Sequence, residues 1–378
     1  MIQSVQAFPL RAPLVESYGW ARGKASVREA LLVQLTADDG TEGWGECAGP
    51  PAVLAAAVTA FFGPLLIGQD PLATEPLWDR LWQAALPHGR RGVLIGALSG
   101  LDMALWDLKG KLLGQSVSAL LGGRTRERMP CYTTGLYFRE GPESERIPRM
   151  LIEARKAVEG GARALLVQVG RSLAADIALA RALRKEFPDI PFAAEAHGSY
   201  DVPEAAIICR ALAEQGFTAL SDPLAAEPVT AWARLAVQTG LPLSVGRYEQ
   251  TRWAFEALLA TQSIGTFQVN PAWCGGLSEA QKIRTVASAH GVNVVPRSPG
   301  TQLNLAASLH FLASDIRHPG RVELRPPLLE TDSLEDPLRE IFAECIEIEE
   351  GLATVPSAPG LGVTVNKTAL FEWLKPTR

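Results

Sequence analysis

Seven short, mostly apolar runs follow one another at even spacing, and each ends in a polar residue: Ala164-Leu-Leu-Val-Gln168, Pro191-Phe-Ala-Ala-Glu195, Phe217-Thr-Ala-Leu-Ser221, Leu243-Ser-Val-Gly-Arg247, Gly265-Thr-Phe-Gln-Val-Asn270, Val292-Asn-Val-Val-Pro-Arg297 and Arg321-Val-Glu323. Subtracting the last positions (168, 195, 221, 247, 270, 297 and 323) gives intervals of 27, 26, 26, 23, 27 and 26 residues. Each interval has room for one strand, one helix and two short loops, and regular spacing of this kind indicates a repeated structural unit.

Helical patterns fill the intervals. Apolar positions recur on one stripe in residues 174–186, 203–215, 231–239, 255–262, 278–290 and 303–314. One further strand, 130–135, and one further helix, 145–159, precede them. Apolar strands alternating with helices predict a parallel sheet, and eight such units predict an α/β barrel of the (β/α)8 type. Because the carboxyl ends of barrel strands form the active site, the polar strand ends are candidate site residues.

The segments before and after the predicted barrel do not show its regular alternation of strands and helices. Partial alternation predicts strands at 2–10, 26–36 and 42–48, with a loop over 14–24, and helices follow at 52–62, 74–85 and 93–113. We therefore expect an α+β domain over 1–125, the barrel over 126–350, and a C-terminal segment, 351–378, that packs back on the first domain.

Composition narrows the class of protein. The net charge is -5 with a pI near 5.7, and no basic block is present, which argues against a nucleic-acid partner. No apolar run approaches the roughly 18 residues of a membrane span. The five cysteines form no Cys-x-x-Cys pair, so buried thiols in the reducing cytoplasm are expected. The expected partner is a small molecule.

Several motifs identify a family. The segment Ala97-Leu-Ser-Gly-Leu-Asp-Met-Ala-Leu-Trp-Asp-Leu-Lys-Gly-Lys-Leu-Leu-Gly114 resembles the enolase superfamily in its mandelate racemase/muconate lactonizing branch, as do Gly43-Trp-Gly-Glu-Cys47 and Cys274-Gly-Gly-Leu-Ser278. The resemblance implies an α+β capping domain over a (β/α)7β barrel, and a homo-oligomer. It also implies substrate contacts from capping loops that include Tyr18 and Trp20. Active members use Mg²⁺ to stabilise an enediolate formed next to a carboxylate.

The metal positions of the family depart from its pattern in this chain. On alignment, the three metal carboxylates fall on Glu195, Ser221 and Arg247, so only Glu195 is of the expected type. A guanidinium at Arg247 would repel a divalent cation in the same hollow. The sequence therefore predicts that no metal cofactor is used, although Mg²⁺ is the default of the family.

The catalytic bases of the family are also replaced. The Lys-x-Lys pair falls on Leu166 and Gln168, and the Asp and His of the base dyad fall on Asn270 and Arg297. Arginine is always charged, so it is a poor proton acceptor. We expect Gln168 and Asn270 to be polar contacts to the substrate.

Two neighbouring residues are the candidate acid/base groups. Glu195 and His197 lie two apart, so a strand that continues this far points both the same way, and histidine titrates near neutrality. The alternative for His197 is a purely structural hydrogen bond to Glu195. Arg247 is expected to pair with Glu195 and either bind a substrate carboxylate bidentately or merely fill the vacated hollow.

Three other polar residues complete the candidate set. Arg297 is the preferred anion ligand because no carboxylate partner is assigned to it. Glu323, at the last run, is a candidate substrate contact. Simple alternation aims Asp222 away from the lumen unless a bulge rotates it inward.

Three functions remain open. The preferred one is a metal-independent lyase or isomerase acting on a small carboxylate or related anion, with His197, Glu195, Arg247 and Arg297 in the catalytic set. The second is a non-catalytic ligand-binding descendant of the family. The third is a Mg²⁺-dependent acid-sugar dehydratase or racemase with shifted ligands: Glu195, Asp222 and Glu249.

Overall fold

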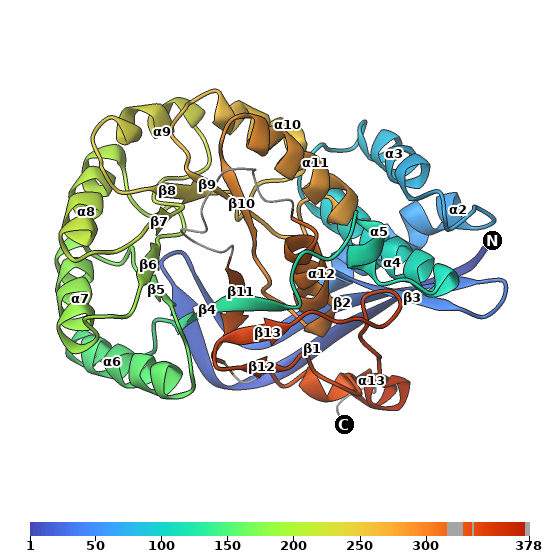
Figure 1. Cartoon of the computed structure of the whole chain (residues 1–378), viewed down its shortest axis with the longest axis horizontal. Helices are drawn as coiled ribbons and strands as arrows, with labels where there is room; N and C mark the ends of the chain where they lie inside the picture. The colour runs from blue at the N-terminus through green and yellow to red at the C-terminus, as the bar shows by residue number, and fades with distance from the viewer. Residues whose placement is uncertain (316–327, 335, 375–378) are drawn as a thin grey trace.

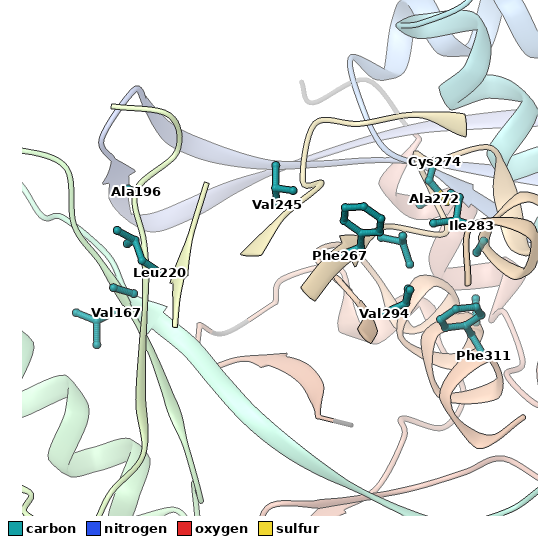
Figure 2. Packing of buried hydrophobic residues seen from close by; sticks show 14 of the residues in the cluster. Val167, Ala196, Leu220, Val245, Phe267, Ala272, Cys274, Ile283, Val294 and Phe311 are labelled. Carbon is teal, nitrogen blue, oxygen red and sulfur yellow. The ribbon is translucent and has the colours of Figure 1, made fainter. Parts of the chain in front are cut away.

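The computed structural model describes residues 1–315, 328–334 and 336–374. Seven strands run parallel in chain order and form most of a barrel: β4 (Arg128–Leu136), β5 (Leu165–Gln168), β6 (Phe192–Glu195), β7 (Leu220–Ser221), β8 (Leu243–Val245), β9 (Thr266–Val269) and β10 (Asn293–Pro296). The strands are short and apolar because both faces are covered. Val167, Leu220 and Phe267 are all buried in one continuous core (Figure 2). The predicted (β/α)7β fold is confirmed.

The eighth strand lies later in the chain than expected. β11 (Leu329–Asp332) pairs in parallel with β4 and lies against β10, so it brings the two ends of the strand series together. The predicted run at 321–323, with Glu323, lies outside the described residues. The strand that takes its place in the barrel, β11, carries Glu330 as its second residue.

Helices cover the outside of the barrel (Figure 1). They are α6 (Glu143–Glu159), α7 (Leu173–Glu186), α8 (Val202–Glu214), α9 (Val229–Ala236), α10 (Thr251–Leu259), α11 (Gly276–Ala289) and α12 (Gln302–Ala313). Their starts follow local capping rules. The Asp201 side chain accepts the backbone N–H of Glu204, and the Glu204 carboxylate accepts that of Asp201, which satisfies two N–H groups at the start of α8.

The first domain is a three-stranded antiparallel sheet with helices on one face. Its strands are β1 (Ile2–Trp20), β2 (Gly23–Ala37) and β3 (Glu42–Cys47), and its helical segments are α1 (Pro51–Ala56), the π-helix η1 (Ala57–Phe62), α2 (Gly63–Leu66), α3 (Thr74–Ala85), α4 (Val93–Leu113) and α5 (Val117–Leu120). The long helix α4 packs closely on β3. A Cβ added at Gly45 would lie 2.1 Å from the carbonyl oxygen of Gly100, so glycine is what allows this approach.

The prediction of a loop over residues 14–24 is wrong. β1 continues to Trp20, and the pairs Tyr18–Ala25 and Trp20–Gly23 extend the β1–β2 hairpin after a register shift. The tip of this hairpin reaches across to the barrel, where Gly19 exchanges backbone hydrogen bonds of 2.7 and 2.8 Å with Phe138 (Figure 1). Pairing with the barrel therefore turns a Gly-rich segment into ordered strand.

Two buried carboxylates fasten the first domain to the barrel. Asp102 of α4 accepts the backbone N–H of Ser278 at 2.9 Å and its hydroxyl at 2.6 Å, at the start of α11. Glu46 of β3 accepts the N–H groups of Thr301 and Asn304 at 3.0 and 3.2 Å, at the start of α12. Carboxylates favour helix N-termini, where N–H groups lack partners.

The described C-terminal segment, up to residue 374, lies beside the first domain. β13 (Leu352–Thr354), which pairs with β12 (Ile348–Glu349), joins the start of β4 in antiparallel fashion. After the short helix η2 (Arg339–Ile341) and these strands, the N–H of Leu361 donates to Asp107 of α4 at 2.7 Å. Phe371 of α13 (Lys367–Trp373) lies 6.2 Å from Phe8, between ring centres. Within the described residues, every helix is too short or too polar to cross a bilayer.

Candidate functional site

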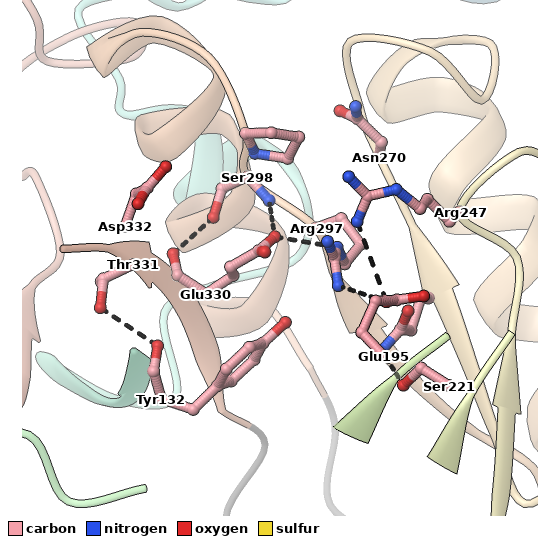
Figure 3. A network of polar contacts seen from close by, with 12 residues as sticks. Tyr132, Glu195, Ser221, Arg247, Asn270, Arg297, Ser298, Glu330, Thr331 and Asp332 are labelled. Carbon is pink, nitrogen blue, oxygen red and sulfur yellow. Dashed lines mark hydrogen bonds and ion pairs between the residues drawn. The ribbon is translucent and has the colours of Figure 1, made fainter. Parts of the chain in front are cut away.

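A buried ion-pair network crosses the carboxyl ends of the barrel strands (Figure 3). Arg297 follows β10 and lies between two carboxylates. Its Nη1 is 3.0 Å from Glu195 Oε2, and its Nε is 3.0 Å from Glu330 Oε2. The backbone N–H of Ser298 also donates to Glu330 at 3.0 Å. Burial raises the pKa of Glu195 and Glu330, and the positive charge of Arg297 acts in the opposite direction.

This network corrects one expectation about Arg297. With no carboxylate partner assigned from the sequence, Arg297 was the preferred anion ligand, whereas the structure gives it two partners. Glu330 was missed because the last strand was placed at 321–323. Glu330 is the second residue of β11 and not its polar end, and the interval from 297 to 330 is 33 residues, which breaks the even spacing.

Arg247 has more donor capacity left than Arg297. Its Nη1 lies 3.8 Å from Glu195 Oε2, which is an ion pair but too long for a hydrogen bond, and this buried Nη1 has no hydrogen-bond partner. The side chain is 23% exposed. The expected pairing of Arg247 with Glu195 is present, and the geometry leaves N–H groups for a bound anion.

Asp222 turns toward the network instead of away from it. Its φ of 42° is unusual for a residue with a side chain and ends the alternation of β7. The N–H of Gly246 approaches Asp222 Oδ1 at 3.4 Å, and the buried Oδ2 has no hydrogen-bond partner. Burial, and then the charge of Glu195, raise the pKa of Asp222 well above its usual value. Burial and the neighbouring negative charge thus both disfavour the ionised form of this carboxyl group.

His197 is not oriented by the alternation that the sequence suggested. β6 ends at Glu195, and His197 has a φ of 53°. Its ring contacts Gln168 and Tyr248 through Nε2 and Nδ1, at 2.8 and 3.0 Å, while only its backbone N–H faces Glu195, at 3.4 Å. Burial and Arg297 lower its pKa to about 3, so the ring is neutral at pH 7.

The remaining candidates take different positions. Trp20 lies over His197, with ring centres 5.9 Å apart, and Tyr18 packs on Tyr137 at 4.4 Å, further from the network. Gln168 contacts His197 through its amide oxygen. Asn270 Oδ1 accepts the N–H of Ala272 and the side-chain amide of Asn304, at 3.0 and 3.1 Å, so that oxygen serves the structure of the β9–α11 loop.

A cavity opens beside the hairpin tip. Its volume is about 400 Å³, and its walls come from the hairpin, the segment after β4 and the segment after β5. Trp20, Lys24, Arg139 and Arg171 are among the lining residues. Trp20 thus lines this cavity and also packs on His197.

The arrangement of carboxylates does not fit a magnesium ion. Among the residues that the structure describes, no three His, Cys, Asp or Glu side chains come together as ligands. Glu195 is contacted by two guanidinium groups, and Glu249 instead faces Arg91 at 3.6 Å. The alternative ligand set of Glu195, Asp222 and Glu249 is thus not assembled.

The comparisons with known proteins point to sugar-acid enzymes. The chain is 37% identical over 351 residues to a D-galactarolactone cycloisomerase of Agrobacterium fabrum, covering 92% of each chain. It is 31% identical over 352 residues to an arabinonate dehydratase of Saccharolobus solfataricus, covering 92% of this chain and 91% of that protein. The relatives therefore favour the alternative of an acid-sugar enzyme over the preferred reading of the sequence.

The expectation of no metal cofactor is contradicted by a solved relative. A mandelate racemase/muconate lactonizing protein from Paracoccus denitrificans was solved in complex with magnesium. It is 28% identical, with a TM-score of 0.85, and the match covers 98% of this chain and 97% of that one. The expectation that no metal cofactor is used, which rested on two replaced side chains, Ser221 and Arg247, was therefore wrong.

Both parts of the chain match family descriptions. Residues 4–122 match the mandelate racemase / muconate lactonizing enzyme N-terminal domain, and residues 149–369 match the enolase C-terminal domain-like family. Together with the barrel and its capping domain, these matches confirm the resemblance seen in the motifs. The chain belongs to the enolase superfamily, in its mandelate racemase/muconate lactonizing branch.

Proposed function

We propose that the protein is an enzyme that eliminates water from a sugar acid, or isomerises the lactone of one. The observation that carries this proposal is the 37% identity to D-galactarolactone cycloisomerase along 92% of both chains. The similarity to an arabinonate dehydratase supports the same substrate class. Both relatives act on polyhydroxylated acids or their lactones, as their names state.

Arg247 is the proposed ligand of the substrate carboxylate. A planar guanidinium matches a carboxylate bidentately, and Arg247 is the arginine of the network with an unpartnered Nη1. Arg297 is held by Glu195 and Glu330, so its role is to fix Glu195.

Glu195 and Asp222 are the proposed proton-transfer pair. In an elimination, one group removes the proton from the carbon next to the carboxylate, and another protonates the leaving oxygen. Glu195, oriented by Arg297, whose positive charge favours the ionised form, suits the first role. Asp222 suits the second because burial and the charge of Glu195 raise its pKa, which favours the protonated form that an acid needs. His197, which is neutral at pH 7, then has the role of orienting groups through hydrogen bonds and not of acting as a general acid.

The test is a substrate survey with purified protein. Sugar acids of five and six carbons and their lactones are incubated with Mg²⁺ present, and products are identified by NMR. We expect turnover of at least one, and a loss of at least 100-fold in kcat/KM for Arg247→Gln, as charged hydrogen bonds contribute roughly 1.5–3 kcal/mol each. Arg128→Gln is the control, since exposed Arg128 pairs with Glu349 at the other end of β4. Equal activity of parent and Arg247→Gln would contradict the assignment.

A second candidate is a non-catalytic sugar-acid binding protein. It is favoured by the Glu195–Arg297–Glu330 network, in which the buried charges already pair with one another instead of waiting for a substrate. In that case the same acids would raise the melting temperature without any product appearing, which separates it from the first candidate.

A further inference from the structure

A hydrogen-bonded chain of three side chains leads from the barrel interior to its mouth. Gln168, at the end of β5, and His197, just after β6, are each 1% exposed, whereas Tyr248, after β8, is 49% exposed. His197 Nε2 lies 2.8 Å from the Gln168 amide oxygen, and His197 Nδ1 lies 3.0 Å from the Tyr248 hydroxyl. Tyr248 follows Arg247 directly, so it stands beside the proposed carboxylate ligand.

The chain is held in place from several sides. The Trp20 ring covers His197 at 5.9 Å between ring centres, and the indole N–H of Trp273 donates to the backbone oxygen of Tyr248 at 3.3 Å. The φ of 53° at His197 costs conformational energy, and such positions persist where the surroundings over-determine them. This geometry indicates that the ring orientation matters.

The direction of the hydrogen bonds follows from the chemistry of each group. A carbonyl oxygen only accepts, so Nε2 of His197 carries the hydrogen and donates it to Gln168. A neutral imidazole has a single N–H, which leaves Nδ1 as an acceptor for the hydroxyl of Tyr248. The Tyr248 hydroxyl then donates its hydrogen to His197 Nδ1, and the lone pairs of its oxygen remain available to a ligand at the barrel mouth.

We propose that Tyr248 is a specificity-determining residue whose hydroxyl oxygen accepts a hydrogen bond from a substrate hydroxyl, with His197 and Gln168 fixing that direction. The substrate class in this inference rests on the proposed function. The direction of the hydrogen bonds among Gln168, His197 and Tyr248 does not. Each bond of such a chain polarises the next, which strengthens the outer acceptor. A sugar acid offers hydroxyl donors that a simple carboxylate lacks.

The first measurement is the tautomer of His197. Nitrogen-15 NMR of the ligand-free protein distinguishes Nδ1–H from Nε2–H, and the His197 signal is identified by its loss in His197→Asn. We expect the Nε2–H form in the parent and in Gln168→Glu, whose carboxylate also only accepts, and a mixed population in Gln168→Leu. An Nδ1–H tautomer in the parent would overturn the proposal whatever the substrate is.

The second measurement uses substrates that each lack one hydroxyl. For the sugar acid that the protein turns over, we expect one deoxy analogue to lose roughly fivefold to tenfold in kcat/KM, the range for one neutral hydrogen bond. Tyr248→Phe should lose the same factor with the full substrate and no longer discriminate against that analogue. Undiminished discrimination in Tyr248→Phe would refute the role. If no sugar acid were turned over or bound while His197 showed Nε2–H, the proposed substrate class would be refuted. The direction of the hydrogen bonds through His197 would still be correct.

Discussion

At the scale of single residues, the anion-binding role depends on which arginine has an N–H group without a hydrogen-bond partner. Two arginines replace family residues at the ends of β8 and β10, with β9 between them, and the sequence favoured Arg297 over Arg247 as the anion ligand. The structure separates them, because Glu195 and Glu330 both contact Arg297, whereas the one carboxylate among the described residues that pairs with Arg247 is Glu195, at 3.8 Å. One arginine therefore belongs to the framework, and the other is available to a ligand.

Removing Glu330 should destabilise the barrel. Glu330→Gln takes away one of the two charges that balance buried Arg297, and breaking a buried pair costs roughly 3–5 kcal/mol. Urea unfolding would show this as a lower midpoint. Glu349→Gln, at an exposed pair with Arg128, should change the free energy of unfolding by less than about 1 kcal/mol. A Glu330→Gln variant as stable as this control would mean that the pair contributes little.

Rebuilding the family carboxylates tests the geometry of the strand ends. Positions 221 and 247 end or follow β7 and β8 beside Glu195. The double variant Ser221→Glu, Arg247→Glu places three carboxylates there, a ligand set that suits Mg²⁺. Calorimetry should report tighter Mg²⁺ binding than in the parent protein. Unchanged affinity would show that the strand ends diverge from the geometry that the ion needs.

At the scale of elements, glycines decide how closely α4 approaches β3. Gly45 leaves no room for a side chain, whereas Gly240 has no heavy atom within 4 Å of an added Cβ. The first domain is therefore built around backbone contact, which the Gly-x-Gly spacing at 43–45 encodes.

Gly45→Ala should be far more costly than Gly240→Ala. An added methyl group 2.1 Å from the Gly100 carbonyl oxygen forces α4 away from the sheet, and overpacking of this kind costs about 1–3 kcal/mol or more. Thermal unfolding of both variants measures the difference. Similar melting temperatures would show that α4 can shift without loss.

At the scale of the whole molecule, the carboxylates of Glu46 and Asp102 join the two domains, and their contribution to the free energy of unfolding depends on pH. Burial raises the pKa of Glu46 to about 7 and that of Asp102 to about 7, although hydrogen bonds from Thr301 and Ser278 oppose the shift. The unfolded chain releases these protons near pH 4–4.5. Between these values the folded state binds more protons, so stability falls as the pH rises.

The slope of stability against pH should therefore depend on Glu46. Between about pH 4.5 and 7, Glu46→Gln should flatten the fall in the free energy of unfolding, because the amide does not titrate. Glu349→Gln, at the surface, should leave the slope as in the parent. Denaturant unfolding at several pH values measures it. An unchanged slope in Glu46→Gln would place the pKa of Glu46 near its ordinary value.

Assembly of several copies remains a prediction, since it came only from the family resemblance. Sedimentation of the purified chain would decide it. The same holds for the division of the chain at residues 125 and 350, for which limited proteolysis is the direct measurement.

The sequence by itself determined the barrel and the strand ends at which polar residues gather, because strand–helix alternation is a local, periodic property. It also placed Glu195 and Arg247 together, since all parallel strands of one barrel end at the same edge. Only the tertiary structure decided what lies across the barrel. Glu330 meets Arg297 because β11 returns to β4, and Tyr248 reaches His197 from a strand two positions away. The left-handed backbone at Asp222 and His197 reorients both side chains. These contacts join segments far apart in the chain, so no local pattern of residues carries them.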